Sequence, residues 1–200
     1  MQWSTIVTVQ RLIGRLVLIT VVVLGLWYVI GHLPGATRFG CRASGAVAHA
    51  TSGDCPASVD AAEGDARWAA ARWATLTDAK VTTGLFYDPD GNEHQFTSGE
   101  DGDAGRVSQI LRDVGVAFPR NATTHPAASH VETKAAARMR DTDVTTGIIV
   151  INNARGVRGG DTVSPYGCVN VLPAILPRAA TLVVWWHGPN GMVNARFIGQ

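Results

Sequence analysis

The second half of the chain alternates between strand-like apolar runs and helix-forming segments, and this alternation restricts the possible folds more than any other feature. Residues 145–153 and 181–186 are continuous apolar runs of the kind that forms buried strands. Residues 130–140 precede the first run, residues 168–176 lie between the two runs, and both segments are typical of helices. Short connections between alternating helices and strands predict an α/β sheet covered by helices.

Turn residues predict three more strands. A hairpin is expected for Thr83–Tyr87 and His94–Thr97, because the residues between them, Asp88-Pro89-Asp90-Gly91-Asn92, are strong turn formers. Asn190-Gly191 predicts another turn, which leads into an edge strand at Met192–Ile198. The expected fold class is therefore α/β with five strands.

A long, largely apolar segment lies near the N-terminus, at residues 12–33. About 20 such residues span a hydrocarbon core of ~30 Å. Arg15 near one end and Trp27-Tyr28 near the other suit the two membrane interfaces. A cleaved signal peptide is the alternative, but an Ala-x-Ala site occurs only at 46–48, far beyond the apolar run. We therefore expect a single-pass transmembrane anchor.

The two cysteines after this segment bear on its orientation. Cys41 and Cys55 lie in a Gly/Ala/Ser-rich linker and could form a disulfide in an oxidising compartment, with two free thiols as the alternative. Positive charges lie on both sides of the apolar segment and hardly discriminate. We expect the C-terminal domain to be extracytoplasmic.

The predicted organisation has five parts. In chain order these are a tail (1–11), the transmembrane anchor (12–33), the linker (34–58), a connecting helix (59–79) and a globular domain (80–200). The connecting helix carries Trp68 and Trp73 at a spacing that suits one broad apolar stripe, and we interpret both as core residues.

Charge is distributed unevenly along the chain. The net charge of +1 excludes a protein that holds nucleic acid by bulk charge alone. Residues 104–200 nevertheless carry ten basic residues against five acidic ones, so only this part suits an anionic partner, with ordinary solvated charge as the alternative. The acidic run Gly99–Asp103 lacks the spacing of an EF-hand and is interpreted as a solvated loop.

The residues that carry chemistry begin two predicted helices. His130 and Glu132 open the helix at 130–140, and Cys168 opens the helix that follows the next strand. This order is the layout of zinc nucleobase deaminases, in which histidine and cysteine bind the metal and the glutamate moves protons. The alternative is a capping box, in which Ser129 and Glu132 satisfy backbone N–H groups at the start of the helix.

Five stretches in a fixed order make the first interpretation more specific. They read TTGLFYDPDG, SHVETKAAARMR, IIVINN, GCVNVLPAILP and ATLVVWW. Residues 80–200 thereby resemble the DddA-like bacterial toxin deaminases of the cytidine deaminase superfamily. The resemblance implies a mixed five-stranded sheet flanked by helices, and one zinc ion held by His130 and Cys168. It also implies that Glu132 is the general acid/base.

The same resemblance bears on substrate and partners. It implies that cytosine in nucleic acid, preferably DNA, is the substrate. It also implies an immunity protein as a partner, in addition to the membrane expected from residues 12–33. Asn152 and Asn153 would line the base pocket, although paired asparagines also simply end strands.

One departure from the family pattern affects the zinc site. The family has a further cysteine just past the paired asparagines, whereas residues 154–160 contain none, and Arg158 stands at the expected position. Arginine stays cationic and cannot bind zinc. His94, His125, His187 or a carboxylate would then have to complete the site.

Two functions are therefore expected as alternatives. The first is a zinc-dependent cytosine deaminase that acts on DNA, of toxin type and tethered to a membrane. The second is a catalytically inactive deaminase-fold domain that keeps a binding or interaction role at the membrane.

Overall fold

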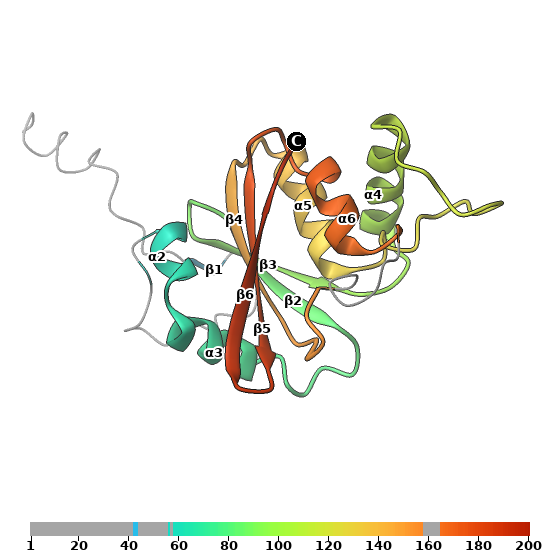
Figure 1. The fold of residues 1–200 in the computed structure, drawn as a ribbon. Helices are drawn as coiled ribbons and strands as arrows, with labels where there is room; N and C mark the ends of the chain where they lie inside the picture. Colours follow the sequence, from blue (N-terminus) through green and yellow to red (C-terminus); the bar gives the residue numbers. More distant parts are fainter. Residues whose placement is uncertain (1–41, 44–55, 57, 158–164) are drawn as a thin grey trace, which may run out of the picture. The chain divides into compact units, whose positions relative to one another are not determined.

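The structure is a computed structural model that describes residues 42–43, 56, 58–157 and 165–200. These residues belong to one compact unit, residues 37–200 (Figure 1). Its elements in chain order are β1 (Arg42–Ala43), α2 (Val59–Glu63), α3 (Ala66–Ala74), β2 (Thr83–Tyr87), β3 (Asn92–Thr97), α4 (Gly102–Asp113), α5 (Val131–Asp141), β4 (Thr146–Ile151), α6 (Cys168–Ile175), β5 (Thr181–Gly188) and β6 (Gly191–Ile198).

The strands form one mixed sheet in the order β1-β3-β2-β4-β5-β6. β2 pairs antiparallel with β3 and β4, β4 pairs parallel with β5, and β5 pairs antiparallel with β6. The predicted α/β class and the predicted five-stranded mixed sheet with flanking helices are confirmed. The two-residue strand β1, which pairs parallel with β3, adds a sixth strand at the edge.

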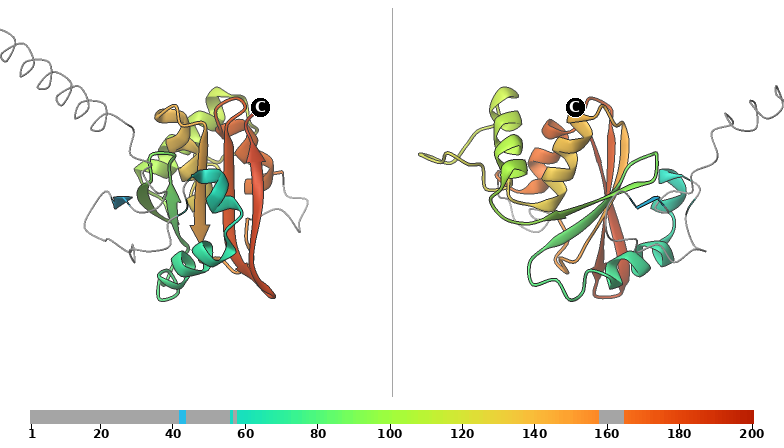
Figure 2. Two further views of the ribbon diagram at one scale, coloured as in Figure 1. Left: turned by 90° about the vertical axis from the view of Figure 1, so that its left-hand side faces the viewer. Right: turned by 180° about the vertical axis from the view of Figure 1, so that it is seen from behind.

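Helices cover both faces of the sheet, α4, α5 and α6 on one face and α2 and α3 on the other (Figure 2). Because successive residues of a strand point to opposite faces, the strands feed two cores. Phe86 and Ile149 belong to the core under α4–α6, whereas Tyr87 and Ile148 belong to the core under α2 and α3. Trp68 is buried in the second core, as predicted for a core residue.

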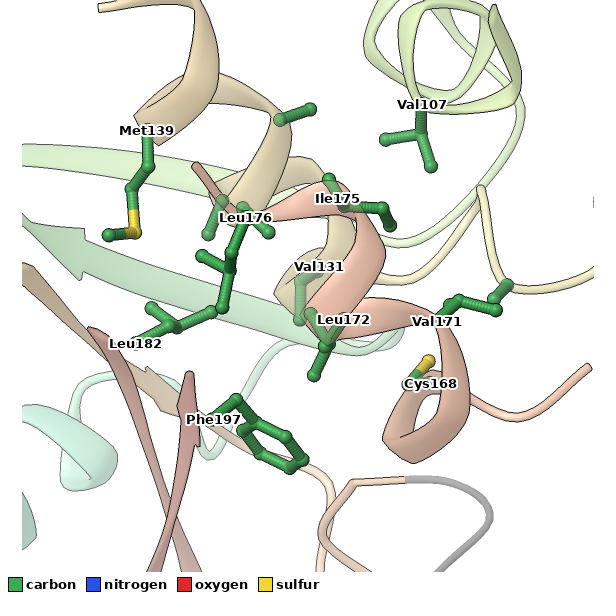
Figure 3. Packing of buried hydrophobic residues seen from close by; sticks show 14 of the residues in the cluster. Val107, Val131, Met139, Cys168, Val171, Leu172, Ile175, Leu176, Leu182 and Phe197 are labelled. Atoms are coloured by element: carbon green, nitrogen blue, oxygen red, sulfur yellow. The ribbon is translucent and has the colours of Figure 1, made fainter. Parts of the chain in front are cut away.

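The larger core surrounds the start of α6. In Figure 3, Cys168, Leu172 and Ile175 of this helix lie among buried side chains from α4, α5, β5 and β6. Cys168 is fully buried at this position. The packing therefore fixes the beginning of α6, where the cysteine lies, relative to α5 and the sheet.

Helix boundaries differ from the predicted ones where capping residues intervene. The single connecting helix expected at 59–79 is divided into α2 and α3. Gly64 ends α2, and the Asp65 carboxylate accepts the Trp68 N–H at 2.9 Å and so caps α3. Similarly, Asp101 of the predicted solvated loop caps α4, because its carboxylate accepts the Ala104 N–H at 2.9 Å.

The expected localisation, a single-pass membrane protein with its domain outside the cytoplasm, is contradicted. Among the helices of the described residues none is long and apolar enough to cross a bilayer. The longest of them, α4, has 12 residues, against the ~20 that a spanning helix requires. The predicted anchor at 12–33 and the predicted disulfide between Cys41 and Cys55 lie outside the described residues.

Candidate metal centre and active site

The first helix of the predicted site begins without a side-chain cap. His130 is the N-cap residue of α5, its backbone is extended, and no side chain caps the helix there. The Thr133 hydroxyl instead contacts the carbonyl oxygens of Ala127 and His130, at 2.6 and 2.8 Å. The N-cap residue is therefore His130 and not Ser129, the capping residue of the alternative interpretation, and Glu132 is only 3% exposed.

The topology brings the starts of α5 and α6 to the same end of the sheet. α6 connects the parallel strands β4 and β5, so it begins near the carboxyl end of β4. α5 precedes β4, so the last residues of α5 lie near the start of that strand. The first residues of α5 therefore also lie near the carboxyl end of β4. His130 and Cys168, one at the start of each helix, are therefore adjacent although 38 positions separate them.

The three predicted side chains form one cluster. His130 Nδ1 lies 2.7 Å from Cys168 Sγ. A ligand atom from each of His130, Glu132 and Cys168 lies within 4.8 Å of the other two. Imidazole nitrogen and thiolate sulfur are ligands that zinc prefers, and the cysteine and the glutamate are buried. The donor set at this position therefore fits a zinc ion.

A polar cavity of about 370 Å³ adjoins the cluster. Its walls come from the start of β2, the ends of β3 and β4, and the start of α5. They consist of Thr82, Ser98, Gly99, Ser129, His130, Glu132 and Asn153. Backbone bonds join these walls, since Ser98 N–H donates to the Thr82 carbonyl at 2.7 Å and Gly99 N–H donates to the Ser129 carbonyl at 2.9 Å.

Residues 56–200 match the family of SCP1.201-like deaminases. The chain belongs to this deaminase family. The match shows a deaminase family and not the DddA-like group in particular, and it also includes α2 and α3. No curated protein matches the chain.

The paired asparagines have different positions in the deaminase fold. Asn153 lines the cavity, and its amide donates to the Gly156 carbonyl at 2.9 Å. Asn152 is not part of the cavity wall. Its side-chain oxygen accepts the Thr83 N–H at 2.8 Å and its nitrogen donates to the Leu76 carbonyl at 3.0 Å. Asn152 thus holds the loop before β2, whereas substrate binding by Asn153 stays a prediction.

Two of the histidines considered as a further zinc ligand of the deaminase lie elsewhere. The His94 ring is 3.1 Å from the Arg138 guanidinium, and burial, helped by this cation, lowers the pKa of His94. The His187 ring stacks on Trp73 of α3, with 4.6 Å between the ring centroids. Neither histidine belongs to the metal-type cluster found among the described residues.

The third histidine, His125, contacts the segments that precede α5 and α6. It is 1% exposed, and burial lowers its pKa, so the neutral imidazole is favoured. Its Nδ1 accepts the Ala127 N–H at 3.2 Å, and its ring packs edge-on against Tyr166, two residues before Cys168. The sequence offered His125 as a ligand, whereas the structure places it between the segments that lead into α5 and α6.

Lys134 is the residue near the site that sequence reasoning missed. Its side chain is fully buried, and its ammonium donates to the Thr97 carbonyl at 2.8 Å, the Gly99 carbonyl at 3.0 Å and the Asp101 carboxylate at 2.5 Å. It lies one helical turn after His130. Lys134 therefore ties the helix of the metal cluster to the cavity wall at Gly99, and its spacing from His130 was the one available signal.

Proposed function

We propose that the chain is a zinc-dependent deaminase that converts cytosine to uracil in DNA. The observation that carries the proposal is the convergence of His130, Glu132 and Cys168 beside a polar cavity. Membership of a deaminase family supports this assignment, because zinc deaminases of nucleobases combine histidine and cysteine ligands with a glutamate that moves protons.

The residues of the cluster have separate roles in this proposal. His130 and Cys168 hold the metal. When bound, zinc supplies Lewis-acid chemistry that makes a water molecule nucleophilic at neutral pH. Glu132 takes the proton of that water and passes protons to the base, so that ammonia leaves and the carbonyl of uracil forms.

The cavity suits a single base better than a stacked duplex. Its volume is about 370 Å³, and polar groups dominate its wall. An enzyme of this type must receive its base from a single strand or a flipped-out nucleotide, because the reacting atom is inaccessible inside a duplex. Asn153, with its amide anchored to Gly156, is the wall residue that we propose contacts the base.

A toxin role extends the same proposal. Conversion of cytosine to uracil alters the genetic information of any cell that receives the enzyme. A producing cell then needs a protein partner that blocks the cavity, which is the immunity protein expected from the resemblance to toxin deaminases.

One sequence observation favours a second function, a deaminase-fold binding domain without catalysis. Arg158 occupies the position where the resemblance expects a third zinc ligand, and an arginine cannot take that role. Residue 158 lies outside the described residues. Within the described part of the chain, the metal-type cluster contains one histidine, one cysteine and one glutamate.

Metal-dependent product formation separates the two functions. The purified full chain is incubated with a single-stranded DNA oligonucleotide that contains one cytosine, with zinc or with a zinc chelator. We expect mass spectrometry to detect uracil with zinc and to detect none with the chelator. Zinc-loaded protein that forms no uracil in DNA would contradict the proposed activity and favour the binding domain.

A further inference from the structure

The cavity mouth lies across the ends of three neighbouring strands. Ser98 follows β3, Thr82 precedes β2 and Asn153 lies just beyond β4, and the sheet order is β3-β2-β4. The pairings of β2 with its antiparallel neighbours place these three residues at the same end of the three strands. Because adjacent strands lie about 4.8 Å apart, the β3 side and the β4 side of the mouth are about 10 Å apart.

The β3 side of the mouth is acidic. Ser98 and Gly99 lead directly into Glu100, Asp101 and Asp103, which are all exposed. Lys134, whose ammonium contacts Asp101, has a fully buried side chain and cannot reach a ligand in solution. A phosphate on this side would face repulsion from the carboxylates.

The β4 side of the mouth presents an exposed arginine on a fixed turn. Arg155 follows the cavity residue Asn153 by two positions, and its N–H donates to the Asn153 side-chain oxygen at 3.2 Å. Gly156 closes the turn through its N–H, which donates to the Asn153 carbonyl at 2.9 Å. Its φ is +66°, and a Cβ there would lie 2.4 Å from the Trp186 ring, so the turn packs tightly on the sheet.

The Arg155 side chain is available for an anionic ligand. It is exposed, and no ion pair of Arg155 occurs within residues 42–43, 56, 58–157 and 165–200. Guanidinium groups bind phosphate through paired hydrogen bonds. The charge difference across the mouth thus favours a phosphate on the β4 side.

We infer that Arg155 binds a backbone phosphate next to the target nucleotide, so that the DNA strand passes over the turn at 153–157 and away from the acidic β3 side. The inference rests on the proposed DNA substrate. In this role Arg155 contributes to the affinity for DNA and to the orientation of the strand. The turn, which the bonds between Asn153 and Gly156 hold, fixes the position of Arg155 relative to the bound base.

Binding of a fluorescent single-stranded DNA oligonucleotide to the full chain, measured by anisotropy over a range of salt concentrations, tests the inference. Arg155→Ala should weaken binding about tenfold, the order of one charge-assisted contact. It should also reduce the magnitude of the slope of log affinity against log salt by about 0.7, the value for one phosphate of a single strand. Arg155→Lys should restore most of that slope.

Arg178→Ala is the matched control. Arg178 is also exposed. It lies three positions before Thr181, which pairs with Thr146 at the start of β4, so Arg178 lies at the end of the strands opposite to the cavity. Its removal should leave affinity and slope nearly unchanged. Equal effects of Arg155→Ala and Arg178→Ala would overturn the inference and leave the proposed function intact. Absence of oligonucleotide binding by the unaltered chain would overturn both.

Discussion

At the scale of single residues, the composition of the metal cluster determines how tightly it can hold zinc. His130 and Cys168 provide a nitrogen and a sulfur ligand, and Glu132 is reserved for proton transfer in the proposed mechanism. Catalytic zinc sites generally use three protein ligands. With Arg158 at the position expected for the third ligand, we expect weaker zinc binding than in a site with all three ligands.

Replacement of Arg158 by cysteine should therefore increase zinc affinity. Arg158→Cys adds a thiolate and removes a positive charge that repels the ion. The gain in zinc affinity should exceed about 10–100-fold, which is what a residue that only hydrogen-bonds to a metal ligand contributes. Competition against a zinc-binding dye measures it, and His130→Ala in the same background should abolish it. An unchanged affinity in Arg158→Cys would show that residue 158 is not at the metal.

The residues of the metal cluster could be predicted because the sequence pattern that identifies them lies within short segments. His130 and Glu132 are two positions apart at a helix start, and Cys168 begins the next helix after a strand. Lys134 could not be recognised in the same way, because its three acceptors belong to a segment more than 30 positions away. The structural role of Asn152 was missed for a similar reason, since its partners precede it by about 70 positions.

At the scale of elements, the turn after β4 links the cavity to the sheet. The Asn153 side chain bonds to the backbone of Arg155 and of Gly156 within this turn, and Gly156 lies against Trp186 with a positive φ. The left-handed backbone conformation and the close ring leave no space for a side chain. The geometry of the Asn153 wall therefore depends on the glycine at 156.

Gly156→Ala should destabilise the fold and reduce uracil formation. The strained backbone and the clash with Trp186 should together cost about 1–3 kcal/mol or more, measured by denaturant unfolding. Gly105→Ala is the control, because Gly105 lies within α4 with open space at its Cβ position. That substitution should stabilise by about 0.5–1 kcal/mol. A Gly156→Ala variant as stable and active as the unaltered chain would show that the turn adapts.

The strands were more predictable than the helix boundaries. Continuous apolar runs and turn formers identify all five main strands, because strand type depends on local pattern. The division of the connecting helix expected at 59–79 depends on the Asp65 carboxylate, which accepts the Trp68 N–H, and the start of α4 depends on the Asp101 carboxylate, which accepts the Ala104 N–H. Both aspartates were visible in the sequence, but each also suits an ordinary exposed position.

At the scale of the whole molecule, the two-sided covering of the sheet explains the extent of the family match. The match begins at residue 56 and so includes α2 and α3, which cover the second core. The sequence predicts only a connecting helix for this segment, because a helix pattern alone does not reveal which sheet face the helix covers. The order of strands likewise results from long-range pairing and could be anticipated only through the family resemblance.

The central claim, that Glu132 moves protons in a zinc-dependent deamination, is tested most directly by uracil formation in Glu132→Ala. Both the unaltered chain and the variant are saturated with zinc and incubated with the single-cytosine oligonucleotide. Glu63→Ala, on α2 at the opposite face of the sheet, serves as the control and should keep its activity. The account predicts that Glu132→Ala keeps its zinc but loses uracil formation by at least about 100-fold, the usual contribution of general acid–base catalysis. Undiminished uracil formation by Glu132→Ala, or none by the zinc-saturated unaltered chain, would contradict it.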